Sequence, residues 1–177
     1  MKHITLIIAA CCLMLTACGQ NANNKSTNNQ ANDNTMKKTL IVYFSATGTT
    51  KAAAQKLAKE FNDDLDEITP EQPYTAADLD WRDKQSRSTI EMQDKSSRPA
   101  IKGRCENIDD YEVIWIGFPV WWYTAPTIIN TFIETHDLSG KTLNVFATSG
   151  GSTVDGSYND LKKAYPQYKW GEKRLMN

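Results

Sequence analysis

The residues best suited to chemistry in this chain form a small, hydroxyl-rich hexad, Ser45-Ala46-Thr47-Gly48-Thr49-Thr50. An apolar run at 39–44 precedes it and an alanine-rich stretch at 51–61 follows it, which predicts a strand, a tight loop and a helix. Backbone N–H groups and the positive end of a helix dipole then face the loop and favour an anion. The alternative is an ordinary strand-to-helix turn. The candidate phosphate-binding residues are Ser45, Thr47, Gly48, Thr49 and Thr50.

The order of residues in and after the hexad indicates which class of phosphate-containing ligand the loop could bind. Lys51 follows the hydroxyls, whereas the loop of nucleoside triphosphatases places its lysine before them. The three spaced glycines of a dinucleotide-binding loop are also missing. An anion held by hydroxyls and amides, with no obligatory cation, suits a terminal monophosphate.

Two further loops carry residue types that suit a planar ring. The first is Pro119-Val120-Trp121-Trp122-Tyr123, where three consecutive aromatic side chains cannot all point inward. We expect at least one ring to line a cleft and to stack on an aromatic ligand, the alternative being a hydrophobic cluster at the edge of the core. The second is Thr148-Ser149-Gly150-Gly151, which offers backbone N–H groups to the polar edge of a ring.

Other reactive residue types give no catalytic pattern. Cys105 stands alone once the cysteines of the N-terminal leader are set aside, so no intramolecular disulfide is predicted. His136 is the only histidine beyond that leader, and no Gly-x-Ser-x-Gly elbow is present, which disfavours a hydrolase. We assign no catalytic side chain and no metal site.

Strand and helix patterns alternate along residues 36–177, which are predicted to form one domain. Strands are expected at 39–44, 64–68, 112–118, 143–147 and 168–175. Helices are expected at 51–61, 76–94, 126–134 and 158–164. This alternation predicts an α/β sheet with right-handed crossovers, whose ligands bind at the carboxyl ends of the strands. The three loops described above all lie at that end.

Together the three loops resemble the flavodoxin family over residues 36–177. The hexad resembles the loop that binds the phosphate of flavin mononucleotide (FMN), Trp121 the aromatic residue that flanks the isoalloxazine ring, and 149–151 the segment at its pyrimidine edge. The closest likeness is to flavodoxin-like proteins with a Pro-x-Trp-Trp-Tyr loop. The resemblance implies a doubly wound, five-stranded parallel sheet of order 2-1-3-4-5 in three layers, and a bound FMN that carries the chemistry.

Three departures from the family pattern carry expectations of their own. No helix is predicted after the strand at 168–175, so we expect exposed apolar sheet surface, and with it a homodimer or a bound partner. The formal charge is only −1, unlike the strongly acidic electron carriers. The loop at 120–125 lacks the glycine that carriers place beside the flavin, and bulky residues disfavour positive φ. We therefore expect the peptide flip that stabilises the half-reduced flavin in the carriers to be disfavoured, and the flavin to take electrons in pairs.

The leading functional hypothesis is a redox flavoprotein, an NAD(P)H-linked two-electron reductase of quinone-like or other small acceptors. The alternatives are a one-electron carrier that docks a redox partner protein, and a binding module that has lost its flavin. The balanced charge, 20 basic against 21 acidic residues, offers no support for binding nucleic acid.

The N-terminal segment is predicted to lie outside this domain. Residues 1–17 combine a basic start with an apolar stretch too short to span a bilayer, as in a signal peptide. Leu15-Thr16-Ala17-Cys18 resembles a bacterial lipobox, in which Cys18 receives the lipid; the alternative is an ordinary secretory signal. The Asn-rich residues 18–35 are expected to form a flexible tether. The predicted location is the cell envelope, with a lipid anchor in the outer membrane and the domain facing the periplasm.

Overall fold

The computed structural model describes residues 38–177. The predicted leader, Cys18 and the tether therefore lie outside the described residues. Within the described part of the chain, no helix has the length and hydrophobicity needed to cross a membrane.

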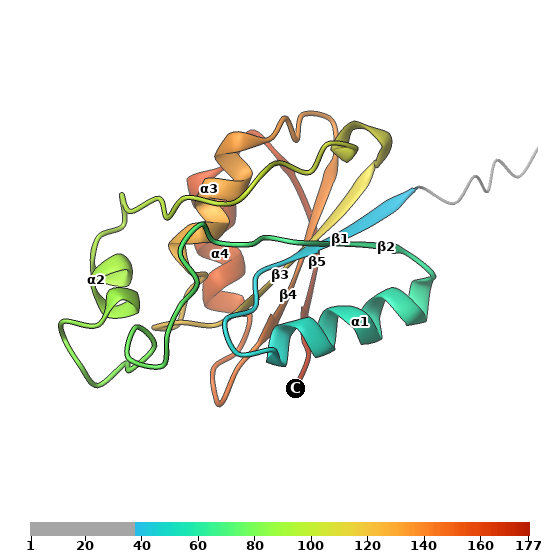
Figure 1. Ribbon diagram of the computed structural model, residues 1–177. Helices are drawn as coiled ribbons and strands as arrows, with labels where there is room; N and C mark the ends of the chain where they lie inside the picture. Colours follow the sequence, from blue (N-terminus) through green and yellow to red (C-terminus); the bar gives the residue numbers. More distant parts are fainter. Residues whose placement is uncertain (1–37) are drawn as a thin grey trace, which may run out of the picture. The chain divides into compact units, whose positions relative to one another are not determined.

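Five parallel strands form one sheet in the order β2-β1-β3-β4-β5, which confirms the predicted topology (Figure 1). The strands are β1 (Thr39–Tyr43), β2 (Asp64–Glu67), β3 (Val113–Pro119), β4 (Thr142–Thr148) and β5 (Lys169–Leu175). β3 and β4 are almost continuously buried, as their apolar sequences require of strands covered on both faces. The order reverses between β1 and β3, so the loops after these two strands open onto the same crevice.

Helices cover both faces of the sheet and make the three layers expected (Figure 1). α1 (Thr49–Phe61) places Ala54 and Leu57 against Ile41 and Phe146 on one face. On the other face, the larger core includes buried residues of α3 (Thr127–Thr135) and α4 (Asp155–Ala164). α3 begins directly after Pro126, as the sequence predicts, because proline is well tolerated where a helix begins.

The helix expected at 76–94 is wrong in its first half. Only α2 (Arg87–Gln93) is helical, and it is followed by a short 3-10 helix at Ile108–Asp110. Aspartate side chains explain the difference, because each accepts a hydrogen bond from a nearby backbone N–H and so favours a turn over a helix. Asp78 accepts from Thr75 at 2.8 Å, Asp80 from Arg82 at 3.1 Å and Asp83 from Gln85 at 2.8 Å.

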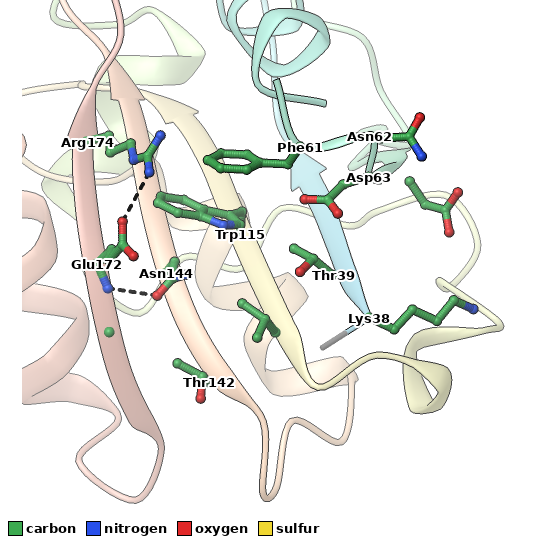
Figure 2. Close-up of a pocket in the computed structure, with 13 residues that line it drawn as sticks. Lys38, Thr39, Phe61, Asn62, Asp63, Trp115, Thr142, Asn144, Glu172 and Arg174 are labelled. Carbon is green, nitrogen blue, oxygen red and sulfur yellow. Dashed lines mark hydrogen bonds and ion pairs between the residues drawn. The ribbon is translucent and has the colours of Figure 1, made fainter. Parts of the chain in front are cut away.

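The sheet face beside α1 is hollowed by a groove of about 760 Å³, and no helix follows β5 among the described residues (Figure 2). Arg174 lies across this groove, with its guanidinium carbon 5.0 Å from the ring centroids of both Phe61 and Trp115. Trp115 is therefore only 4% exposed, and the lining also contains Thr142 and Asn144. Phe61 at the edge of this groove is 42% exposed, and the homodimer or bound partner stays a prediction.

Candidate functional site

The hydroxyl hexad forms the predicted loop between β1 and α1, and Ser45 organises it. The Ser45 Oγ accepts hydrogen bonds from the backbone N–H groups of Gly48 and Lys51, each at 3.1 Å. Gly48 has φ of 90°, a left-handed conformation that glycine adopts without steric cost. Hydrogen bonds to its own serine therefore hold the loop together.

Donors remain at the start of α1 for an anion. Thr49 and Thr50 are the first two residues of the helix, so their N–H groups have no intrahelical acceptor. The hydroxyls of Thr47 and Thr49 lie 3.3 Å apart on the exposed side of the loop. Thr50 differs, because its side chain is buried and its Oγ1 lies 2.8 Å from Thr148 Oγ1. The Thr50–Thr148 bond therefore joins the phosphate loop to the end of β4.

Lys51 is directed to a carboxylate of the sheet. Its Nζ lies 2.8 Å from Glu67 Oε2, and Tyr43 donates a hydrogen bond to the same oxygen at 3.1 Å. The hydrogen bond to Glu67 raises the pKa of Lys51, and burial followed by the charge of Glu67 raises the pKa of Tyr43. The hexad thus offers hydroxyls and amides, while its neighbouring cation is already paired.

The aromatic loop after β3 is a tight turn. Trp121 and Thr124 exchange two backbone hydrogen bonds of 3.0 Å, and both central residues have positive φ, 45° at Trp122 and 68° at Tyr123. This is the pattern of a type I′ turn, which normally contains asparagine and glycine. Two bulky residues of this loop therefore adopt positive φ, the conformation that their side chains disfavour. Backbone strain of this kind concentrates at functional sites.

The three aromatic side chains of this loop are placed differently. Trp121 packs edge-on against Phe44 and Tyr74, with ring centroids 5.6 and 5.4 Å away. Trp122 and Tyr123 are exposed, by 40% and 78% respectively. Trp121 therefore anchors the turn in the core, and its two neighbours present their rings to solvent.

Gly156 in α4 lets the strained turn approach the helix. A Cβ at this position would lie 2.6 Å from the carbonyl oxygen of Tyr123. We expect Gly156→Ala to lower the free energy of unfolding by about 1–3 kcal/mol, the usual cost of overpacking, in urea unfolding experiments. Asn159→Ala, an exposed change in the same helix, is the control. Because alanine otherwise favours a helix over glycine, a more stable Gly156→Ala variant would contradict the contact.

One pocket of about 490 Å³ is lined by residues of all three predicted strand-end loops, although Ser45, Gly48, Thr49, Thr50 and residues 148–151 do not line it. Ala46 and Thr47 of the hexad and Ser152 after β4 line it. The whole predicted aromatic segment lines it too, as Pro119, Val120, Trp121, Trp122 and Tyr123. The expected cleft with an aromatic wall is therefore present at the carboxyl ends of the strands.

The loop after β4 is held by its own serine and is less open than expected. Ser149 Oγ accepts hydrogen bonds from the N–H groups of Gly151 at 3.2 Å and Ser152 at 2.7 Å. The N–H of Ser149 donates to Asn177 Oδ1 at 3.0 Å. Gly150 and Gly151 are exposed, and Thr148 is buried against Thr50.

Sequence reasoning missed three residues of the pocket wall: Leu79, Trp81 and Ser88. They lie in the long connection between β2 and β3, whose polar sequence resembles that of an exposed segment. The sequence offered one signal for this wall, the large apolar Trp81 in an otherwise polar stretch. In the structure its side chain is 70% exposed, which is unusual for a tryptophan without a binding role.

His136 and Cys105 are structural residues. The His136 Nε2 accepts a hydrogen bond from the Cys105 N–H at 3.0 Å, and its Nδ1 lies 2.8 Å from the carbonyl oxygen of Phe132. Burial, with a contribution from Asp66, raises the pKa of the Cys105 thiol to about 11. Neither group is poised as a base or a nucleophile, and the described residues contain no cluster that would hold a metal ion.

The fold and the pocket define a doubly wound α/β protein with a hydroxyl-rich loop and an aromatic-lined cleft at its topological switch point. The sequence model of the flavodoxin family matches residues 38–177. The chain therefore belongs to the flavodoxin family.

Solved structures agree with this assignment. A candidate flavoprotein from Bacteroides eggerthii DSM 20697 is 57% identical, with a TM-score of 0.78, over 78% of this chain and 87% of that one. One from Bacteroides uniformis ATCC 8492 is 51% identical, with a TM-score of 0.77, over 78% and 89%. A flavoprotein from Lactobacillus acidophilus NCFM, solved in complex with FMN, is 25% identical, with a TM-score of 0.66, over 79% and 93%. No protein of curated function matches the chain.

Proposed function

We propose that this protein binds FMN and is a two-electron oxidoreductase that uses reduced nicotinamide and a quinone-like acceptor. The proposal rests on one observation: residues of the hexad and of the aromatic turn line the same pocket. A loop that favours a phosphate lies at one part of this pocket and exposed aromatic rings at another, which matches the two chemical halves of FMN. The complex of the Lactobacillus relative with FMN supports the same cofactor.

The residues present suit this cofactor. The phosphate would be held by the hexad, where the N–H groups of Thr49 and Thr50 have no intrahelical acceptor and Thr47 carries an exposed hydroxyl. Trp121, Trp122 and Tyr123, which all line the pocket, would flank the isoalloxazine ring, and Ser152 of the loop after β4 would meet its polar edge. Bound FMN supplies electron transfer, so the protein needs to bind, orient and shield the ring without an acid or base of its own.

The rigidity of the aromatic turn favours transfer of electrons in pairs. Its two mutual hydrogen bonds and the Trp121 ring packed against Phe44 and Tyr74 hold the peptide groups of the turn in place. A backbone rearrangement that displaces Trp121 or Thr124 in response to a single added electron would break these contacts. The near-neutral charge also gives a one-electron protein partner little electrostatic attraction.

Two measurements test this function. The purified full-length protein is expected to be yellow and to release FMN on denaturation. Loaded with FMN, it is expected to oxidise NADH or NADPH with a 1,4-naphthoquinone as acceptor, and to reduce a one-electron acceptor such as cytochrome c much more slowly. Colourless protein that FMN does not bind would refute the cofactor, and the reverse order of acceptors would favour the one-electron carrier.

We also propose that Cys18 anchors the protein to the outer membrane. Cys18→Ser is expected to release the protein from the membrane fraction or to block its maturation, as seen by fractionation and immunoblot. Cys12→Ser is the matched control, because it changes a cysteine of the predicted leader and leaves the lipidation site intact. A Cys18→Ser protein as firmly membrane-bound as the control would refute the anchor.

A further inference from the structure

The pocket has a wall that none of the three strand-end loops provides. Leu79, Trp81 and Ser88 form it, and all three belong to the connection between β2 and β3. The Ser88 N–H donates to the Asp78 carbonyl at 2.9 Å, which fixes the start of α2 to the turn before it. This hydrogen bond holds the residues of the wall in a defined position relative to one another.

Ser88 carries a hydroxyl without a partner. Its side chain lines the pocket and is only 2% exposed, yet its Oγ makes no hydrogen bond among the described residues. The neighbouring hydroxyls of Ser86 and Thr89 are bonded to each other at 2.8 Å. Buried polar groups almost always have a partner, and of the four described buried hydroxyls without one, Ser88 is the one that lines this pocket and can meet a ligand there.

The charges beside this wall indicate what kind of ligand. Arg82 lies next to Trp81 and is paired with Asp80, whose carboxylate is 3.2 Å from the Arg82 Nε. Leu79 and the exposed ring of Trp81 add apolar and aromatic surface. Among residues 38–177, no lysine or arginine lines the pocket, so the wall suits a neutral, planar molecule with one hydrogen-bonding group better than the phosphates of a nicotinamide dinucleotide.

We infer that Ser88 is a specificity-determining residue, whose hydroxyl donates a hydrogen bond to a carbonyl oxygen of a planar quinone-class acceptor bound in this pocket. The inference rests on the proposed function, because the acceptor binds beside the flavin. The polar groups available to the flavin at the strand ends belong to the hexad and to Ser152, which line the same pocket. Ser88 comes from the connection between β2 and β3, and its hydroxyl would therefore bind the acceptor and not the flavin.

The test uses the full-length protein loaded with oxidised FMN, without reductant, so that no turnover occurs. Binding of 1,4-naphthoquinone and of 1,4-dimethylnaphthalene, which lacks the carbonyl oxygens, is followed by changes in flavin absorbance. Ser88→Ala is expected to raise the Kd of the quinone about 2- to 10-fold, the net effect of one hydrogen bond, and to leave that of the hydrocarbon unchanged.

Ser157→Ala is the matched control. Ser157 is also a buried serine with an unpaired Oγ in a helix, and it does not line the pocket. Both variants remove an unpaired hydroxyl, so neither is expected to lower Tm. Equal effects of the two variants on the quinone, or loss of FMN affinity in Ser88→Ala alone, would overturn the inference. Wild-type protein that binds no FMN would instead refute the proposed function.

Discussion

FMN is expected to bind the cofactor-free protein about 100- to 10,000-fold more tightly than riboflavin, which has the same ring and lacks the phosphate. Thr49 and Thr50 begin α1 with N–H groups that have no intrahelical acceptor. Each hydrogen bond to a charged phosphate contributes about 1.5–3 kcal/mol, and two such bonds account for the expected ratio. Fluorescence titration of both flavins measures it, because each flavin fluoresces in solution and is quenched against aromatic rings.

Two variants identify the groups responsible for this preference. Thr47→Ala removes an exposed hydroxyl of the loop and is expected to weaken FMN more than riboflavin. Lys51→Gln is the control, because the Lys51 ammonium is already paired with Glu67, and its effect on the ratio is expected to stay below about 3-fold, as for an exposed charge. Equal affinities for the two flavins, or a ratio that collapses only in Lys51→Gln, would refute binding of the phosphate by hydroxyls and amides.

The parts of the fold that the sequence predicted are those set by local patterns. β3 and β4 are apolar runs covered on both faces, and their composition alone indicates buried parallel strands. The hexad was also predictable, because a strand, a hydroxyl-rich loop with glycine and a helix follow one another within a short stretch. The strand order came from the family resemblance, since alternation of strands and helices does not fix it.

The parts that were missed depend on contacts between distant segments. The wall residue Ser88 is buried by the tertiary packing of a polar connection, and no local pattern distinguishes it from Ser86 or other serines nearby. Likewise, the positive φ of Trp122 and Tyr123 opposes their intrinsic preference. Packing of Trp121 against Phe44 and Tyr74 holds the turn in a conformation that its own central residues disfavour.

Because the aromatic turn is strained, we expect substitutions that relieve the strain to raise the stability of the protein and to lower its affinity for FMN. Replacing both central residues, Trp122→Asn with Tyr123→Gly, installs the pair that type I′ turns prefer. Each left-handed non-glycine residue costs about 1–2 kcal/mol, so the double variant is expected to gain about 1–2 kcal/mol in the free energy of unfolding after the entropic cost of glycine. It also removes two rings from the pocket wall, and FMN affinity is expected to fall about 10- to 100-fold.

Urea unfolding of the cofactor-free protein and FMN titration measure the two effects separately. Tyr123→Phe is the matched control, because it keeps the ring and the positive φ and is expected to change neither quantity appreciably. A double variant that loses both stability and FMN affinity would show that the rings stabilise the turn and that the turn stores no strain. A double variant that gains stability and keeps full FMN affinity would show that the rings of Trp122 and Tyr123 do not contact the flavin. Opposite changes in the two measurements are expected only if the chain maintains a strained turn in order to hold aromatic side chains at the cofactor.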